Sequence, residues 1–575
     1  MKIKEKELSL EDIQICEYIK NNEKEEYEKI IENDSKIETI LALSSIRQNI
    51  IKWYPFRENS TVLEIGANYG ELTQVLCERL SKVVALEGSE EKRNAIIERN
   101  KEKLNLEVVG DIEKLNEKFD YITIIGIENI KNDFQEILEE LKKYLNTDGI
   151  ILMAANNRLG MQYFSKTSAA GENITNQSEE KLYTLKELEK QINKAGYTNF
   201  KIYYPMTDYK LTNVIFTDKK PLSKNNLARN IVYNSEDTIK FYDQNEAYRE
   251  VLEENEGVFR LFANSFFIEI FKGDYIENEI RLVAFSNMRK PQYRIQTIMK
   301  KDFVYKYADS EISKKHLENI KENIEILKQS GLNTIDDYDK EKIISKYTEE
   351  LTLDKVIINL IKEHKQKEAI DLINKFKEEL VNNLEKSHED KNVFDEYKIE
   401  YQKEKIQNMT LVKYGLWDLI FQNCFYIDNK FYFYDQEWKK ENVPVEFILY
   451  RAIKYFERLK KYISSNELYE IMGIDGQQIK LFDELDNKIQ EEIRDEITWK
   501  VHTQGRTMLD LKREKLTDNH NMNLLKIDNE QKENIIQQKE EEIKKLKIEL
   551  DNIYNSKSWK ITKPLRQIKK LRNKQ

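Results

Sequence analysis

The distribution of apolar residues predicts helices at the N-terminus, followed by an alternation of strands and helices. In the first fifty residues, apolar positions recur at the spacing of an α-helix, which predicts a helical segment over residues 1–50 that acts as a lid or packing element. From Thr61 onward, short apolar runs alternate with amphipathic segments, and five runs predict strands: TVLEIG, KVVALE, LEVVGD, FDYITIIGI and GIILMAA. This alternation is typical of a parallel α/β sheet with helices on both faces.

A different pattern begins near Ile280. The runs RLVAFSN, QYRIQTIMK and DFVYKYA predict strands, and helical periodicity then continues from Ser313 to about residue 500. Strands followed by helices predict a separate α+β domain. Near the C-terminus, apolar residues take the a and d positions of a heptad repeat: Ile536, Ile543, Leu546, Leu550 and Ile553. They predict a coiled-coil helix, with a solvated single helix as the alternative.

The composition favours a helix-rich protein of several domains. A chain of 575 residues exceeds what one hydrophobic core supports, and it combines 34% charged residues with only 16 Gly and 6 Pro. The net charge of −10 argues against a nucleic-acid-binding protein. The 3 cysteines show no CxxC or Cys/His spacing, and no apolar run suits a signal core or a membrane span. We therefore expect a cytoplasmic protein without disulfides or zinc.

One predicted strand-to-helix turn combines glycines with acidic residues in a pattern that suits a nucleoside. The segment Val62–Thr73 runs from a strand through Gly66 and Gly70 into a helix, and glycine lets a backbone approach a ligand closely. Glu64 lies before the turn, and Glu87 closes the next strand, where a carboxylate can accept hydrogen bonds from both ribose hydroxyls. A NAD-binding fold or a purely structural turn would share parts of this pattern.

The full set of motifs resembles the class I S-adenosylmethionine-dependent methyltransferases, which have a Rossmann-like fold. Besides E-x-G-x-x-x-G and the acidic residue on the second strand, the chain has Gly110-Asp111, Phe119-Asp120 and Asp148-Gly149 at the third, fourth and fifth strands. The resemblance implies that this cofactor is bound by Glu64, Gly66 and Gly70 at its methionine part, with Asn68 in the same loop, by Glu87 at the ribose and by Asp111 at the adenine. Asn68 and Tyr69 replace the small residues common in the family, so we expect a less open loop.

The sequence favours an oxygen atom as the methyl acceptor. The segment after the fourth strand, Gly126–Asn129, differs from the N/D-P-P-Y/F signature of enzymes that methylate amino groups. The acceptor side is expected at Asn156–Gly160 and Tyr203–Lys210. Arg158 in the first of these segments and Lys210 in the second could hold an anion such as phosphate, or they could be ordinary surface charges with packing stems.

A second group of polar residues is arranged as in enzymes of the kinase fold. Asp418 is followed by Asn423 and, after a predicted hairpin, by Asp435. In that fold, one carboxylate orients the accepting hydroxyl, while an Asn and a second Asp supply oxygen ligands to the Mg²⁺ that bridges the ATP phosphates. We therefore assign Asp418 a catalytic role and Asn423 and Asp435 to the metal, with ordinary turn and capping roles as the alternative.

Upstream residues fit the same resemblance in the required order. Lys306, in a predicted strand, would contact the ATP phosphates, and Glu322 in the helix that follows would be its ion-pair partner. The segment Tyr347–Asp354 looks like the hinge of small-molecule kinases. The expected nucleotide loop, Ser286–Gln292, contains no glycine, and this departure puts ATP turnover in doubt.

The order of these parts resembles the bifunctional methyltransferase-kinases that terminate bacterial O-polysaccharide chains. We expect an N-terminal helical segment (1–50), a class I methyltransferase domain (51–225), a connecting segment (226–280), a protein-kinase-like α+β domain (281–510), a coiled-coil helix (515–555) and a basic amphipathic tail (556–575). The resemblance implies that ATP and Mg²⁺ serve to phosphorylate the end of a glycan, and that the phosphate is then methylated at the inner face of the cell membrane.

The expected partners follow from the same resemblance. They are a glycan or glycolipid-linked acceptor, glycosyltransferases, a membrane surface at the tail and a second copy of the chain at the coiled coil. The tail from Ser556 resembles the ends of proteins encoded with surface-glycan glycosyltransferases, and its mixture of basic and apolar residues suits a membrane interface, a partner-binding helix or a disordered terminus. The alternative functions are direct methylation of a sugar hydroxyl beside a non-catalytic kinase-like module, and a membrane-associated scaffold for glycosyltransferases.

Overall fold

The five strands predicted between Thr61 and Asn156 form the parallel core of one sheet. They are β1 (Thr61–Ile65), β2 (Lys82–Leu86), β3 (Leu106–Val109), β4 (Phe119–Ile125) and β5 (Leu145–Asn156). Their order in the sheet is β3-β2-β1-β4-β5, and each neighbouring pair is parallel. The prediction of a parallel α/β sheet is thus confirmed.

The computed structural model describes residues 8–34, 36–127, 133–165, 182–221, 258–389, 391–401, 409–456 and 459–495, with residue 539, residues 543–547, residue 555 and residue 559 beyond them. Two compact units divide the chain, Met1–Gly505 and Arg506–Gln575. In the second unit, residues 543–547 are helical, and Ile543 and Leu546 are exposed. The rest of the predicted coiled coil (515–555) and nearly all of the predicted tail (556–575) lie outside the described residues.

Helices cover both faces of the parallel core because successive strand residues point to opposite sides. Val62 of β1 packs with α5 (Thr73–Arg79), whereas its neighbour Leu63 packs with α7 (Phe134–Leu141) and α9 (Leu185–Lys194). The remaining helix between these strands is α6 (Glu90–Arg99).

Three further strands extend this sheet beyond β5. They are β6 (Asn199–Met206), β7 (Val214–Thr217) and β8 (Ser265–Phe271), in the order β5-β8-β6-β7. The antiparallel strand β8 comes from the stretch 226–280 that the sequence pattern assigns to a connecting segment. Strand β8 therefore belongs to the same sheet as the five parallel strands although it lies beyond residue 225, because it supplies the hydrogen-bonding partner of both β5 and β6.

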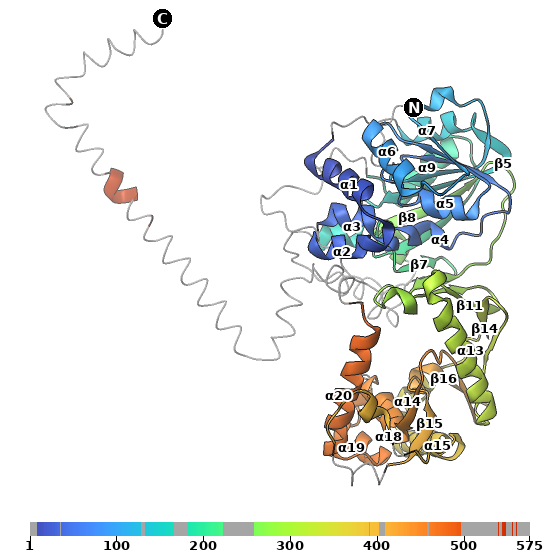
Figure 1. Ribbon diagram of the computed structural model, residues 1–575, viewed down its shortest axis with the longest axis vertical. Helices are drawn as coiled ribbons and strands as arrows, with labels where there is room; N and C mark the ends of the chain where they lie inside the picture. Colours follow the sequence, from blue (N-terminus) through green and yellow to red (C-terminus); the bar gives the residue numbers. More distant parts are fainter. Residues whose placement is uncertain are drawn as a thin grey trace, which may run out of the picture. The chain divides into compact units, whose positions relative to one another are not determined.

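The N-terminal residues form the expected helical segment. It comprises α1 (Leu10–Asn21), α2 (Tyr27–Asn33), α3 (Ile37–Leu43) and α4 (Asn49–Lys52), with short 3-10 turns between them. Apolar residues of the first three helices pack with Tyr69 and Ala95 of the first domain. Helix α1 lies against α6, close to the turn after β1 (Figure 1).

The strands predicted after Ile280 continue the same sheet. They are β9 (Leu282–Phe285), β10 (Ile295–Met299) and β11 (Phe303–Ala308). Two strands that the sequence pattern did not predict, β13 (Asp336–Tyr338) and β14 (Lys342–Lys346), join them, and all pair antiparallel. The backbone of β9 pairs with that of β7, so thirteen strands of the described chain share one sheet. Helix α13 (Lys314–Gln329) packs on this antiparallel part.

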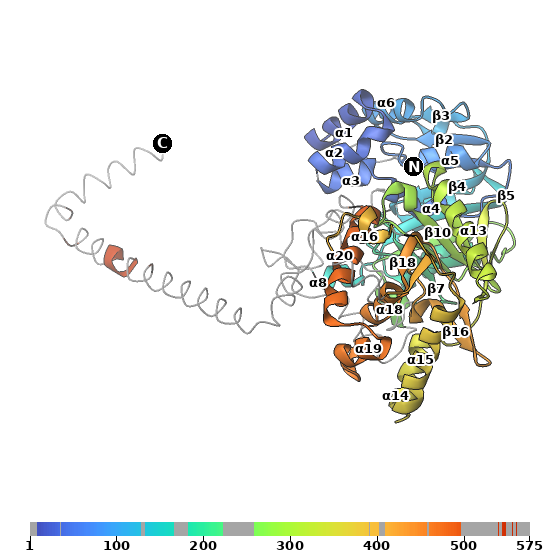
Figure 2. The same cartoon turned by 60° about the horizontal axis from the view of Figure 1, so that its bottom comes forward.

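A mostly helical region follows and encloses the largest apolar core of the described residues. Its helices are α14 (Leu353–Lys362), α15 (Gln366–Asn383), α16 (Val393–Glu396), α18 (Val445–Lys454), α19 (Ser465–Met472) and α20 (Gly476–Ile493). Two small sheets pair β15 (Leu411–Gly415) with β18 (Lys440–Pro444), and β12 (Asn333–Thr334) with β17 (Lys430–Phe433) and β16 (Cys424–Ile427). Helices α14 and α15 lie side by side (Figure 2). The sequence pattern predicts a separate α+β domain here, whereas the pairing of β9 with β7 joins its first strands to the sheet of the first domain.

The remaining described helices are α8 (Met161–Ser165) and α12 (Phe259–Phe262). Within the described ranges, no helix is both long and apolar enough to cross a membrane.

Candidate functional site

The turn after β1 has the left-handed backbone that its glycines predict. Gly66 has a φ of +73°, Asn68 of +52° and Gly70 of +75°. Space around the two glycines differs, however. A side chain at Gly66 would meet no atom within 4 Å, whereas one at Gly70 would lie 3.0 Å from the Asn100 side chain and 3.3 Å from the backbone of Ile96. Gly66 thus faces open space suited to a ligand, and Gly70 allows close packing against α6.

The two acidic residues of the motif have different environments. Glu64 is buried beneath the turn, where its Oε2 accepts a 2.6 Å hydrogen bond from the Thr73 hydroxyl, and burial raises its pKa to about 8. Glu87 follows β2, and its two carboxylate oxygens accept hydrogen bonds from the backbone N–H of Asn68 (3.0 Å) and of Ser89 (3.1 Å). Each oxygen of Glu87 retains a further lone pair, which is what binding to ribose hydroxyls requires. Glu64, in contrast, is buried behind the turn and supports its conformation through the hydrogen bond from Thr73.

The adenine end of the predicted site lies after β3. Asp111 is exposed there, and its carboxylate accepts a 3.0 Å hydrogen bond from the backbone N–H of Glu113. The Arg93 side chain crosses the neighbouring Gly110 and donates to the carbonyl of Glu87 at 3.0 Å. Asp111 and Glu87 therefore belong to the same edge of the sheet, the carboxyl ends of β2 and β3, where parallel sheets bind their ligands.

Two residues near the turn were missed by the sequence pattern. Asp12, in α1, accepts hydrogen bonds from the Tyr69 hydroxyl and from Lys92 at 2.9 Å. Lys92 also donates to the Asn68 side chain at 3.0 Å. Burial would raise the pKa of Asp12, but the bonds from Tyr69 and Lys92 hold it well below its usual range. This cluster fastens α1 to the glycine turn, and only the helical periodicity of residues 10–21 pointed towards it.

The expected acceptor side is described only in part. Arg158 forms an ion pair with Glu187 at 2.6 Å, so its charge is already balanced by a carboxylate. The segment from Tyr203 to Lys210 supplies buried residues of β6 and the loop after it. Residues 128–132, 166–181 and 222–257 lie outside the described residues.

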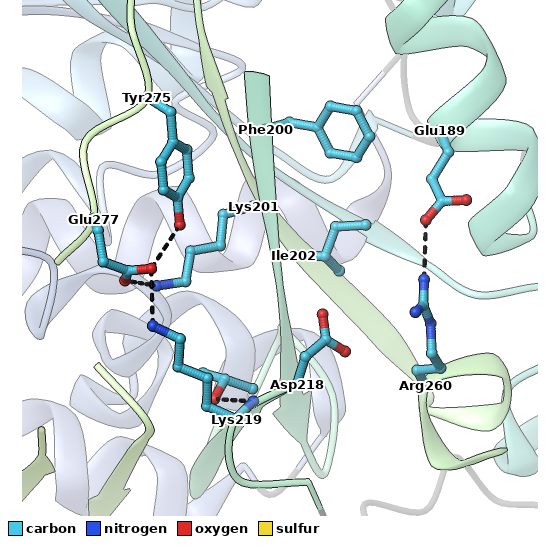
Figure 3. A pocket seen from close by; sticks show the side chains of 10 residues that line it. Glu189, Phe200, Lys201, Ile202, Asp218, Lys219, Arg260, Tyr275 and Glu277 are labelled. Carbon is cyan, nitrogen blue, oxygen red and sulfur yellow. Dashed lines mark hydrogen bonds and ion pairs between the residues drawn. The ribbon is translucent and has the colours of Figure 1, made fainter. Parts of the chain in front are cut away.

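A hollow of about 280 Å³ is lined by residues far from the glycine turn. It lies at the start of β6, the edge of the sheet opposite the glycine turn, and Figure 3 shows its side chains. Its charged groups are paired: Glu277 binds Lys201 and Lys219, each at 2.9 Å, and accepts a hydrogen bond from Tyr275 at 3.0 Å. Volume alone does not make this hollow a catalytic site, because no predicted site residue lines it.

In the second domain, the structure brings together residues that are far apart in the sequence. Lys306 of β11 forms ion pairs with Asp435 and, at 2.5 Å, with Glu437. Glu437 also binds Arg289, and it lies 3.6 Å from the Nε2 of His316. Burial would raise the pKa of Glu437, but Arg289 and Lys306 hold it well below its usual range. Asp435 has a φ of +62°.

Glu322 does not occupy the position predicted for it. Its carboxylate binds Lys439 at 2.7 Å and is 62% exposed, so it is not the ion-pair partner of Lys306. Glu322 is absent from the buried residues of α13, which are His316, Leu317, Ile320, Lys321, Asn323, Ile324 and Leu327. Glu437 takes the expected role, and the sequence pattern missed it.

The loop before the hairpin holds Asp418 and Asn423 as expected. Asp418 is partly buried beside Arg451 of α18, with 3.3 Å between its Oδ1 and the guanidinium. Burial raises the pKa of Asp418, and Arg451 partly opposes this effect. Asn423 donates from Nδ2 to the carbonyl of Asp418 at 3.2 Å, which leaves its Oδ1 as the acceptor of the amide. Across the described part of the chain, no three His, Cys, Asp or Glu side chains cluster to form a metal site.

Comparison with known proteins agrees with the first site. The sequence model of a family described as a methyltransferase domain matches residues 38–202. The turn, Glu87 and Asp111 all fall within this match. The chain therefore contains a class I S-adenosylmethionine-dependent methyltransferase domain, and the open face of Gly66 beside Glu87 fits that cofactor. Among curated proteins, none matches the chain significantly.

Several solved structures share parts of the fold. A SAM-dependent methyltransferase from Aquifex aeolicus is 18% identical, with 31% of this chain and 92% of that chain covered and a TM-score of 0.23. A SAM-dependent methyltransferase from Thermotoga maritima is 15% identical, with 43% and 98% covered and a TM-score of 0.26. The plantazolicin methyltransferase BamL is 13% identical, with 45% and 95% covered and a TM-score of 0.25. The assignment rests on the family match and on the glycine turn, not on these structures.

Proposed function

We propose that the chain is an O-methyltransferase of bacterial surface polysaccharide synthesis whose kinase-like domain phosphorylates the end of a glycan before methylation. The methyl-transfer part is carried by one observation: Gly66 presents open space at the carboxyl end of β1, next to the buried carboxylate of Glu87. The phosphorylating part is supported by the contact of Lys306 with Asp435 and Glu437, since a lysine beside two carboxylates is what a nucleotide and its metal ion require.

In the methyltransferase domain, binding and positioning do most of the chemistry. S-adenosylmethionine, when bound, supplies an electrophilic methyl group on its sulfonium. Glu87 accepts hydrogen bonds from the ribose, and the backbone N–H groups of Asn68 and Ser89 fix the orientation of that carboxylate. An acceptor phosphate oxygen is already anionic, so in-line transfer to it needs no general base, and alignment of the reacting atoms is the main requirement.

In the kinase-like domain, the roles follow from the contacts of four residues. Lys306 would bind the ATP phosphates, and the oxygens of Asp435 and Asn423 would hold the Mg²⁺. Asp418 would orient the accepting sugar hydroxyl, and Arg451 fixes the carboxylate of Asp418 from below. Glu437, rather than Glu322, is the buried carboxylate that holds Lys306 in place.

The cellular setting belongs to the same proposal. A glycan or glycolipid-linked acceptor, contact with glycosyltransferases and peripheral attachment to the inner face of the cell membrane through residues 556–575 follow from the resemblance. Association of two copies through residues 515–555 would place several active sites near one membrane-bound acceptor.

A second candidate function has a specific observation in its favour. Asp418 is paired with Arg451, and Lys306 is paired with Asp435. Ion pairs of this kind can also be purely structural. In this case, the chain would methylate a sugar hydroxyl directly, and the second domain would only bind the glycan or a partner enzyme.

The two candidates are separated by measuring ligand binding to the full chain by calorimetry. We expect S-adenosylmethionine to bind and Glu87→Ala to weaken it strongly, while ATP with Mg²⁺ binds and Asp435→Ala removes that binding. Matched controls are Glu136→Ala and Asp371→Ala, two exposed acidic residues on α7 and α15. Donor binding without ATP binding would favour the second candidate, and failure to bind the donor would refute both.

A further inference from the structure

The loop between β9 and β10, Ser286–Gln292, lacks glycine and has few free backbone donors. The N–H of Ser286 donates to the carbonyl of Ile295 at 3.2 Å, and that of Arg289 donates to the carbonyl of Ser286 at 3.2 Å. The N–H of Lys290 donates to Ile493 at 2.9 Å, and Pro291 has none. Because these donors are already used within the protein, they cannot bind phosphate as the amides of a glycine-rich loop do.

The methyltransferase domain fixes the conformation of this loop. The Asn287 Oδ1 accepts a 2.8 Å hydrogen bond from Asn49 of α4, and its Nδ2 donates to the carbonyl of Thr212 at 3.1 Å. Asn287 and Asn49 are both buried. Because Asn287 is held in this way, the backbone position of Arg289, two residues further along the loop, is fixed as well.

Arg289 extends from this loop to the residues that surround Lys306. It forms an ion pair with Glu437, and its guanidinium lies over the ring of Trp438, 5.3 Å from the centroid. Glu437 is thus shared by two cations, Arg289 and Lys306. The side chains of Arg289 and Asp435 retain 27% and 37% of their surface exposed, whereas that of Glu437 retains 6%. The side chains of Arg289 and Asp435 are therefore partly exposed to solvent, next to the buried carboxylate of Glu437.

We propose that Arg289 binds the phosphates of a nucleoside triphosphate in the second domain, in place of the backbone amides of a glycine-rich loop. This inference rests on the proposed kinase-like function. A guanidinium can give two parallel hydrogen bonds to a phosphate, and the indole below it holds its plane. Glu437 keeps Lys306 at 2.5 Å and His316 at 3.6 Å, so it remains paired when Arg289 turns to a phosphate.

The test compares Arg289→Ala, Arg289→Lys and the control Arg260→Ala in the full chain. Arg260 is a suitable control because it also pairs with a glutamate, Glu189, at 3.1 Å, but in the first domain. Calorimetry measures binding of ATP with Mg²⁺, of adenosine and of S-adenosylmethionine. Loss of a charged hydrogen-bond pair predicts roughly 10- to 100-fold weaker ATP binding in Arg289→Ala, with part of it restored in Arg289→Lys. Adenosine and S-adenosylmethionine should bind unchanged, which excludes misfolding.

Three outcomes overturn the inference in different ways. If Arg289→Ala binds ATP as well as the wild type, or more tightly, the residue is a structural ion pair or blocks the site. If adenosine binding falls as much as ATP binding, Arg289 supports the site as a whole rather than the phosphates. If the wild type itself binds no ATP, the kinase-like function fails together with the inference. The first outcome refutes the inference alone, provided that Asp435→Ala loses ATP binding.

Discussion

Replacement of Arg451 by methionine removes the cation from beneath the loop that carries Asp418. The guanidinium binds Asp418 at 3.3 Å, donates to the carbonyl of Trp417 at 3.1 Å and forms an ion pair with Asp486, and its side chain is 6% exposed. Asp486 keeps Lys454 at 2.8 Å, so the main loss falls on Asp418, which loses its ion-pair partner at a partly buried position. Removing one partner of a buried ion pair lowers the free energy of unfolding by about 3–5 kcal/mol. Because the lysine remains in place, we expect this variant to lie at the lower end, with a loss of about 3 kcal/mol.

The loss of stability caused by Arg451→Met should increase as the pH rises. Burial already raises the pKa of Asp418, and loss of Arg451 raises it further. A carboxyl group whose pKa is raised in the folded state lowers the stability progressively as the pH rises from the unfolded-state pKa towards the raised folded-state pKa. The difference between wild type and Arg451→Met should therefore be larger at pH 8 than at pH 5.5.

Urea unfolding followed by tryptophan fluorescence measures this effect, since Trp417 and Trp438 both lie in the second domain. The matched control is Arg260→Met, whose exposed ion pair with Glu189 should contribute at most about 1 kcal/mol. In the double variant with Asp418→Asn, much of the lost stability should return, because no unpaired charge remains. A loss below about 1 kcal/mol in Arg451→Met, or one that does not shrink at low pH, would refute the reasoning.

Three further predictions concern the methyltransferase domain. Glu64→Gln should reduce the loss of stability between pH 5 and pH 8 seen by urea unfolding, because over this range the unfolded chain ionises Glu64 while burial, which raises its pKa to about 8, keeps it protonated in the folded protein; equal losses in both proteins would contradict this. Gly66→Ala should weaken S-adenosylmethionine binding by calorimetry more than it lowers the melting temperature, whereas Gly70→Ala, which crowds α6, should do the reverse; the opposite ranking would reject the two roles. Asp12→Asn should destabilise the fold by about 1–2 kcal/mol at pH 7 and by less at pH 3, since the depressed pKa of Asp12 stabilises the fold only where the unfolded chain is ionised; a constant loss would argue against it.

The local sequence pattern was enough to predict β1 to β5. Each of these strands is a short apolar run between amphipathic helices, and both patterns can be read from neighbouring residues alone. It failed for β8. Ser265–Phe271 is fully buried, yet its partners β5 and β6 are distant in the sequence, and Glu269 within it obscures the apolar pattern. That carboxylate is accommodated by hydrogen bonds from the hydroxyls of Tyr54 and Tyr203, which no local pattern reveals.

The candidate sites show the same limit. Lys306, Asn423 and Asp435 could be singled out because the order of their residue types along the chain resembles that in kinase-fold enzymes, and their roles stay predictions. Glu322 was wrong because the choice among neighbouring glutamates depends on the helix face: Ile320, Asn323 and Ile324 are buried, whereas Glu322 lies on the exposed side of α13. Glu437 is found only when the fold brings it to Lys306.

The pairing of β9 with β7 limits how the chain can be divided. A fragment that ends at residue 225 would lack β8, so that β5 and β6 would each lose a partner, and open strand edges promote aggregation. A fragment that ends after Phe271 would keep β8 but leave the edge of β7 bare where β9 now lies. The two domains are therefore best regarded as one folding unit, in which neither set of strands is complete alone.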